Sequence, residues 1–307
     1  MTMIPSNEAS GVLPFLLDAG PARAAMRGRL VRIDAVASSI LERHGYPPGV
    51  AELTAEAMAL GAALASTMDY DGVFTLQASG DGLIRTLFSD VTSGGAVRGY
   101  ASVADDASGL DQRGYPAPVL DLMGAGYLAF TVDQGEGGRY QGIVPIEAPD
   151  LGAVSLRYFR DSEQIDTAII LAARPAHAAQ AGSGGWHAAA LLLQRIPETG
   201  GREGIRIADD IGDDHWHTAC TLMATCSRDE LTDPALLPDV LLHRLFHEMG
   251  VTVLPFRPLR DECRCSPERV DRMLATLSVE ERRELADDDD MITVACEFCK
   301  IEHRQAI

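Results

Sequence analysis

The distribution of cysteines limits the architecture of this chain more than any other feature. The chain has six cysteines, and none occurs in its first 219 residues. Four of them lie near the C-terminus as two pairs, Cys263-Arg-Cys265 and Cys296-Glu-Phe-Cys299. A secreted disulfide scaffold would spread its cysteines through the fold, whereas a terminal cluster in a cytosolic chain is typical of metal or redox chemistry. The pattern therefore predicts a small C-terminal module organised around these two pairs.

Composition indicates a folded, acidic protein. Apolar residues make up 46% of the 307 residues, which is enough for a sizeable core, and the formal net charge is −19. Such a charge repels phosphate backbones, so we expect no nucleic-acid partner. No apolar run approaches the roughly 18 residues of a membrane span, and Met1–Gly20 lacks the basic-then-apolar pattern of a secretory signal. We therefore expect a cytoplasmic protein with no membrane partner.

Apolar periodicity and turn residues predict an α+β fold. Two β-hairpins, Val73–Ala78 with Leu83–Ser89 and Tyr127–Asp133 with Tyr140–Ile146, alternate with helical segments rather than forming repeated βαβ units. We expect an N-terminal extension over residues 1–26, to which no role is assigned, and an α+β core domain over 27–199. A helical linker over 200–258 and a zinc-binding module over 259–307 complete the predicted organisation.

Within the module, helix signals separate the two cysteine pairs. Ser266 precedes Pro267 and can cap a short helix, and Ser278-Val-Glu-Glu281 is a capping-box sequence that opens a second one. Met291–Ala295 is expected to be a strand that leads into Cys296. Side chains two apart on an extended chain share a face, so Cys263 and Cys265 can point at one ion.

We interpret Cys263, Cys265, Cys296 and Cys299 as the ligands of one Zn²⁺, with an iron–sulfur cluster as the alternative for a four-sulfur site. A module of this size buries too little apolar surface to fold securely alone, so the metal would supply much of its stability. Oxidation to disulfides would remove the ligands and that stabilisation. Because a Cys-x-Cys disulfide closes an unusually small ring, the arrangement favours a switch over a permanent brace.

These residues resemble the 33 kDa heat-shock chaperonin family, the bacterial redox-regulated holdases. The resemblance rests on Cys263-Arg-Cys265-Ser-Pro-Glu-Arg269 followed by Cys296-Glu-Phe-Cys299, and it extends upstream over most of the chain. The upstream matches include Arg27-Gly28, Thr75-Leu-Gln77, Gly80-Asp-Gly82, Arg98-Gly-Tyr100, Tyr140-Gln-Gly142, Tyr158-Phe-Arg-Asp-Ser-Glu-Gln164 and Leu245-Phe-His-Glu248.

The resemblance implies a non-enzymatic, ATP-independent chaperone that is inactive while reduced and zinc-bound. It implies that oxidants form the disulfides Cys263–Cys265 and Cys296–Cys299, with loss of zinc and unfolding of the linker. The active form, often a homodimer, would hold unfolded client proteins during oxidative stress and pass them to ATP-dependent foldase chaperones. Shortly after its last cysteine the family usually carries aromatic residues, whereas His303 and Gln305 stand near those positions here.

Other interpretations compete with this one. A thiol–disulfide oxidoreductase would use Cys296 and Cys299, but it usually needs a thiol at a helix start in a βαβ setting. A constitutive zinc adaptor would lose activity on oxidation instead of gaining it. We interpret Cys220 and Cys226 as small apolar helix residues, and His243 with His247 as a structural or solvated pair. His303 is a candidate replacement ligand after a cysteine is oxidised.

Overall fold

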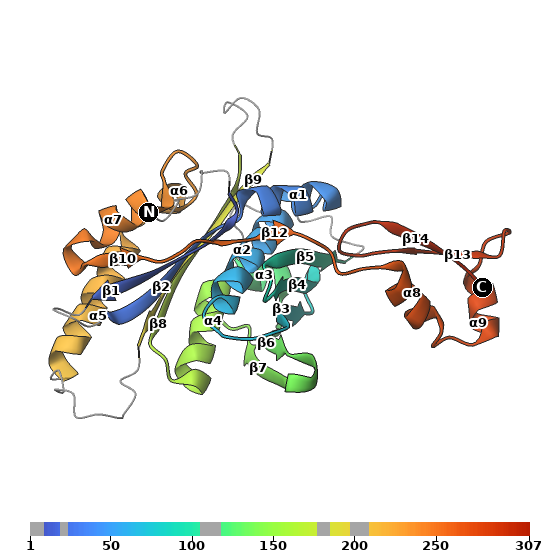
Figure 1. The fold of residues 1–307 in the computed structure, drawn as a ribbon, viewed down its shortest axis with the longest axis horizontal. Coiled ribbons are helices and arrows are strands. Elements are labelled where there is room, and N and C mark those ends of the chain that lie inside the picture. The colour runs from blue at the N-terminus through green and yellow to red at the C-terminus, as the bar shows by residue number, and fades with distance from the viewer. Residues whose placement is uncertain (1–8, 19–23, 105–117, 177–184, 197–208) are drawn as a thin grey trace. The chain divides into compact units, whose positions relative to one another are not determined.

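The computed structural model describes residues 9–18, 24–104, 118–176, 185–196 and 209–307. The chain divides into two units, Met1–Asp261 and Glu262–Ile307. The first unit contains two six-stranded sheets and the helices packed on them (Figure 1), which confirms the predicted α+β class.

The first sheet has the strand order β10-β1-β2-β9-β8, and β11 also pairs with β1. All of these pairs are antiparallel. The strands are β1 (Gly11–Asp18), β2 (Ala24–Arg32), β8 (Thr167–Pro175), β9 (Trp186–Arg195), β10 (Val251–Val253) and β11 (Arg257–Pro258). The edge strand β8 pairs with β9 along its whole length, from Thr167 opposite Gln194 to Pro175 opposite Trp186.

The second sheet has the order β12-β5-β4-β3-β6-β7, in which only β12 runs parallel to its neighbour. Its strands are β3 (Val73–Gly80), β4 (Ile84–Thr92), β5 (Ala96–Val103), β6 (Gly126–Asp133), β7 (Arg139–Pro145) and β12 (Arg260–Asp261). The pairs β3–β4 and β6–β7 confirm the two predicted hairpins. A 3-10 turn, Gly135–Gly137, joins β6 to β7.

Helix α2 (Pro48–Ala65) lies between the two sheets (Figure 1). Pro48 occupies the first helical turn, where a missing N–H costs nothing, and the alanine- and leucine-rich sequence that follows strongly favours a helix. Every residue from Val50 to Ala65 is buried. We call the apolar cluster between the two sheets the inner core. Three more helices pack into it, namely α1 (Asp34–His44), α3 (Val119–Met123) and α4 (Leu151–Tyr158), and α4 continues as a π-helical turn to Glu163.

The opposite face of the first sheet is covered by α5 (Asp209–Ala224), α6 (Arg228–Leu231) and α7 (Pro238–Phe246), with a 3-10 turn at His247–Met249. We call the apolar cluster between these helices and the first sheet the outer core. Phe15 of β1 stacks on Phe246 of α7 with ring centroids 5.8 Å apart. Gly28 lies opposite Phe15, and a Cβ there would be 2.0 Å from the Phe15 ring, so glycine makes room for this contact.

Two segments differ from the sequence-based expectation. The extension 1–26, to which no role was assigned, contains β1, and the segment 200–258, expected to be helical, also contains β10 and β11. Pro14 interrupts the apolar run of β1 and argues against a central strand. It is tolerated because it lies between the residues paired with β10 and those paired with β11, where no ladder donor is required.

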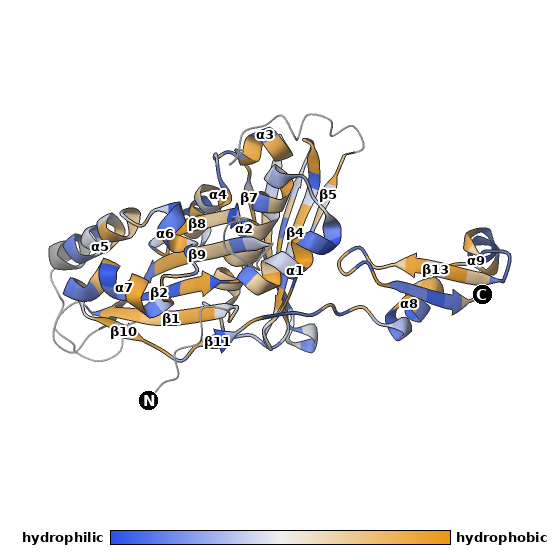
Figure 2. Ribbon diagram, turned by 90° about the horizontal axis from the view of Figure 1, so that it is seen from above, coloured by the Kyte–Doolittle hydropathy of each residue, from blue (hydrophilic) through white to orange (hydrophobic). Residues whose placement is uncertain are grey.

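The second unit is small. It contains α8 (Pro267–Leu274), α9 (Val279–Leu285) and a hairpin of β13 (Met291–Ala295) with β14 (Glu302–Ala306). In Figure 2 β13 is largely orange and the strand beside it blue, in line with the sequences MITVA and EHRQA. Only Val270, Leu274 and Ile292 form its buried apolar cluster. Among the described residues, no helix of either unit is long and apolar enough to cross a membrane.

Candidate metal centre

The first cysteine pair lies on an irregular extended segment directly before α8. Ser266 follows Cys265 and caps the helix, since its side-chain oxygen accepts a hydrogen bond from the N–H of Arg269 at 3.3 Å. Pro267 occupies the first helical position. The cap and the proline therefore fix where the helix begins, and they hold Cys263 and Cys265 immediately outside it.

The second pair lies in the tight turn that connects β13 to β14. The N–H of Cys296 donates to the carbonyl of Ile301 at 2.9 Å, and the N–H of Lys300 donates to the carbonyl of Cys296 at 2.8 Å. Lys300 has a positive φ of 58°, which lets the chain reverse directly after Cys299. This backbone arrangement is a tight knuckle, and it brings both thiols together.

All four sulfur atoms meet. Their Sγ atoms lie within 4.8 Å of one another, with Cys263 and Cys296 at 3.7 Å and Cys265 and Cys299 at 3.3 Å. Zn–S bonds of about 2.3 Å in a tetrahedron place the sulfurs about 3.8 Å apart. The spacing and the soft sulfur donors fit one metal ion, so the predicted residues are brought together in a cluster that can hold a metal.

The environments of the thiols differ. Burial, together with hydrogen bonds to neighbouring thiols, raises the pKa of Cys265. Burial also acts to raise the pKa of Cys296, but the backbone N–H groups of Cys299 and Phe298 outweigh it and lower that pKa overall. Donors aimed at a sulfur stabilise its thiolate form, which is the form that binds metals and reacts with oxidants.

His303 lies next to the cluster without belonging to it. It projects from β14 opposite Val294, and its Nε2 is 3.4 Å from the Sγ of Cys265. The sequence indicated His303 as a replacement ligand; the structure places it within hydrogen-bonding distance of one of the four sulfurs.

The remaining candidates lie in the first unit. Cys220 lies in α5 as predicted, whereas Cys226 follows the end of that helix and precedes α6. Cys226 is buried in the outer core, where burial raises its pKa to about 11, and Cys220 is half-buried with a raised pKa for the same reason. Burial thus favours the protonated thiol over the nucleophilic thiolate at both positions. The rings of His243 and His247 lie 5.5 Å apart. In the described part of the chain, the four terminal cysteines form the only group arranged to hold a metal.

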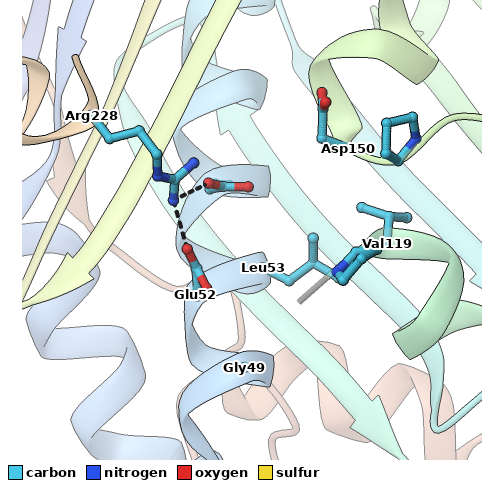
Figure 3. Close-up of a pocket in the computed structure, with 9 residues that line it drawn as sticks. Gly49, Glu52, Leu53, Val119, Asp150 and Arg228 are labelled. Atoms are coloured by element: carbon cyan, nitrogen blue, oxygen red, sulfur yellow. Dashed lines mark hydrogen bonds and ion pairs between the residues drawn. The ribbon is translucent and has the colours of Figure 1, made fainter. Parts of the chain in front are cut away.

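A second polar cluster was not indicated by the sequence. Glu52 and Glu56 on α2 and Arg228 on α6 line a cavity of about 260 Å³ together with Asp150 (Figure 3). Arg228 Nη2 lies 2.6 Å from Glu52 Oε1 and 3.0 Å from Glu56 Oε1. Two glutamates at i and i+4 within an otherwise apolar helix are the signal that could have identified this cluster.

Comparisons with known proteins identify the family of this chain. A protein-family model described as "Hsp33 protein" matches residues 15–305. The chain is 36% identical over 276 residues to the 33 kDa chaperonin of Caulobacter vibrioides (strain NA1000 / CB15N), covering 89% of this chain and 88% of the relative. It is 34% identical over 276 residues to the 33 kDa chaperonin of Pseudomonas aeruginosa (strain UCBPP-PA14), covering 89% of this chain and 85% of the relative.

The fold is also shared with a solved structure. The crystal structure of the 33 kDa chaperonin from Thermotoga maritima superposes with a TM-score of 0.75 at 19% identity, covering 97% of this chain and 95% of the other. The family model and the relatives span nearly the whole sequence, which confirms the resemblance inferred from the cysteine motifs. The chain therefore belongs to the Hsp33 family of 33 kDa chaperonins.

Proposed function

We propose that this protein is a redox-regulated, ATP-independent chaperone that binds unfolded client proteins under oxidative stress. The names of the relatives support a chaperone, and the lack of enzymatic activity is part of the proposal. The observation that carries the redox part of the proposal is the four-cysteine cluster in a unit with only three buried apolar side chains.

The proposed cofactor of the reduced protein is one Zn²⁺ bound by Cys263, Cys265, Cys296 and Cys299. Zinc would hold the four sulfurs as thiolates and contribute on the order of 10 kcal/mol to the folding of its module. Such a contribution is large beside the core that Val270, Leu274 and Ile292 can form. The second unit is thereby made dependent on the reduced state of its cysteines.

Oxidation is proposed to join Cys263 to Cys265 and Cys296 to Cys299. Each disulfide forms as two thiolates lose two electrons to one peroxide molecule, whose O–O bond breaks to give water or hydroxide. The Sγ atoms of all four residues lie within 4.8 Å, so each pair needs only a local movement to reach bonding distance. Sulfurs held in disulfides no longer donate to the ion, and the module loses its main stabilisation.

Unfolding of the zinc-binding module is proposed to change the position of the linker. We propose that residues 200–258 undock from the core domain, 27–199, when the zinc-binding module, 259–307, unfolds. Undocking would uncover the apolar side chains of the outer core, which are the proposed contact surface for clients. On the same family likeness, we propose that the oxidised form is a homodimer in the cytoplasm that passes its clients to ATP-dependent foldases.

One titration tests the proposal. The reduced, zinc-loaded protein is treated with increasing peroxide at a temperature of mild heat stress, while zinc release and suppression of client aggregation are followed together. We expect both to begin at the same peroxide dose. Equal suppression by the reduced and oxidised forms contradicts the switch, and zinc loss without gain of suppression favours a constitutive zinc adaptor.

The oxidoreductase alternative has less support in the structure. Its low-pKa thiol would be Cys296, but this residue lies in a hairpin turn and not at the start of a helix. Measured turnover of a disulfide substrate would nevertheless reverse the assignment.

A further inference from the structure

Three arginines hold one segment of the predicted linker against the first sheet. The segment runs from Ser227 to Leu237 and contains α6 and the turn that follows it. Arg32 of β2, which is only 7% exposed, donates to carbonyl oxygens of this segment. Its partners are Glu230 at 3.3 Å, Leu231 at 3.2 Å, Asp233 at 2.9 Å and Leu236 at 2.5 Å.

Arg174 of β8 makes the second attachment. Its Nε donates to the hydroxyl of Thr232 at 2.8 Å, and its Nη2 donates to the Thr232 carbonyl at 3.2 Å. The Thr232 hydroxyl in turn donates to the carbonyl of Arg228 at 2.8 Å, and Thr232 is only 2% exposed. Arg32 and Arg174 therefore provide donors for the carbonyl groups of Leu231 and Thr232 at the end of α6.

Arg228 makes the third attachment, in which the donor lies on the segment and the acceptors lie on the first sheet. Its side chain leaves α6 and donates to the carbonyls of Leu171 at 3.1 Å and Ala173 at 3.3 Å on the edge strand β8. The same guanidinium reaches Glu52 and Glu56 of α2, the helix between the two sheets (Figure 3). Arg228 therefore connects the outer layer to the inner core around the edge of the sheet.

The two glutamates make this attachment costly to break. Glu52 and Glu56 are 3% and 7% exposed, and they share one guanidinium. Burial raises the pKa of both carboxyl groups, that of Glu52 to about 8, whereas the positive charge of Arg228 lowers both and so stabilises the charged form. Withdrawal of Arg228 leaves a carboxylate that is poorly solvated and has no counter-ion.

The attached segment also closes the outer core. Leu231 is fully buried, and α7, which follows the segment, buries Leu241, Leu242 and Phe246 against the first sheet. We propose that Arg32, Arg174 and Arg228 form a clamp that keeps α6 and α7 docked, and that opening this clamp uncovers the apolar outer core without any change at the cysteines. That the uncovered surface binds clients rests on the proposed function.

The test uses the full-length, reduced, zinc-loaded protein and the variant Arg228→Met, which keeps an apolar stem but removes the guanidinium. Hydrogen–deuterium exchange is measured over residues 227–246 and, as an internal reference, over the strands of the second sheet. We expect exchange in 227–246 to rise about tenfold or more, while β3, β4 and β6 stay protected. Arg244→Met is the matched control, because the ion pair described for Arg244 is an exposed one, 3.1 Å long, with Glu230 of the same segment. This variant should change exchange less than twofold.

A second variant distinguishes opening of the clamp from a general loss of folding. In Arg228→Met/Glu52→Gln/Glu56→Gln the buried carboxylates are neutralised, so the inner core stays intact while the bonds of Arg228 to β8 remain absent. Elevated exchange over 227–246 in this protein supports the clamp, and wild-type exchange there overturns it. Client suppression is measured on the same reduced samples. Faster exchange without suppression upholds the clamp and contradicts the proposed client surface, so the two ideas fail separately.

Discussion

At the scale of single residues, His303 is a side chain in direct contact with one of the four sulfurs. Its Nε2 lies 3.4 Å from the Sγ of Cys265, and in the tautomer that carries the proton on Nε2 it donates to that sulfur. Hydrogen bonds from outside a metal's ligand set typically account for about 10- to 100-fold in affinity. We therefore expect His303→Phe to weaken zinc binding about tenfold in competition with a chromogenic chelator.

Two variants separate the hydrogen bond from packing. His303→Gln restores an N–H donor and should recover most of the affinity. Gln305→Ala removes a neighbouring side chain of β14 whose amide contacts only the carbonyl of Pro267 among its described hydrogen bonds, and it should leave affinity within about twofold. If His303→Phe binds zinc as tightly as the wild type, the hydrogen bond has no influence on the site.

Glu52 gives a prediction for the pH dependence of stability. Burial, then the neighbouring Glu56, raises its pKa to about 8 against the opposing effect of Arg228, from a usual value near 4.5. Because the pKa of Glu52 is higher in the folded than in the unfolded protein, protonation of Glu52 favours the folded state. Its contribution to the free energy of unfolding is complete below pH 4.5 and declines as the pH rises toward 8. Between these values the free energy of unfolding should fall by up to about 1.4 kcal/mol per pH unit.

Urea midpoints measured at several pH values across this range test the prediction. Glu52→Gln should flatten the slope, since the variant has no proton to lose. Glu147→Gln is the control, because Glu147 pairs with Arg157 at the surface with 59% of its side chain exposed. An unchanged slope in Glu52→Gln would assign the pH dependence to other groups.

At the scale of elements, local sequence signals predicted the helix starts and hairpins that they determine directly. Ser266 and Ser278 cap α8 and α9 as expected, and the hairpins β3–β4 and β6–β7 follow from alternation and turn residues. Spacing and capping likewise allowed the four cysteines to be predicted as one cluster. The strands β1, β2, β5, β10, β11, β12 and β14 were not predicted. Pro14 breaks the strand pattern of β1, and long-range pairing stabilises strands as short as Val251–Val253. The contact between His303 and Cys265 depends on β14 and therefore could not be predicted from the sequence either.

The Ser266 cap makes a prediction at this scale. Its oxygen satisfies the N–H of Arg269 at the start of α8, directly after Cys265. Loss of such a cap costs about 1 kcal/mol, which corresponds to about a fivefold change in an equilibrium constant. Ser266→Ala should weaken zinc binding by about that factor, as measured by chelator competition. Ser266→Thr keeps the acceptor and should bind nearly as the wild type; equal affinities for all three proteins would show that the helix start does not position the cysteines.

At the scale of the whole molecule, the two units differ in what stabilises them. The first has two extensive apolar clusters, on the two faces of its first sheet, whereas the second has three buried apolar side chains and the cysteine cluster. Removal of metal by a strong chelator under reducing conditions should therefore unfold residues 262–307 and leave the core domain, 27–199, folded.

Hydrogen–deuterium exchange of the same chelated sample resolves the two units. We expect full exchange within seconds over α8, α9, β13 and β14, with β3, β4 and β6 still protected, and recovery of protection when zinc is added back. The variant Cys263→Ser/Cys265→Ser should show the same loss without chelator and no recovery with zinc. Persistent protection of 262–307 in the metal-free, reduced protein would mean that its folding does not depend on the ion, and that oxidation must act on the linker by another route.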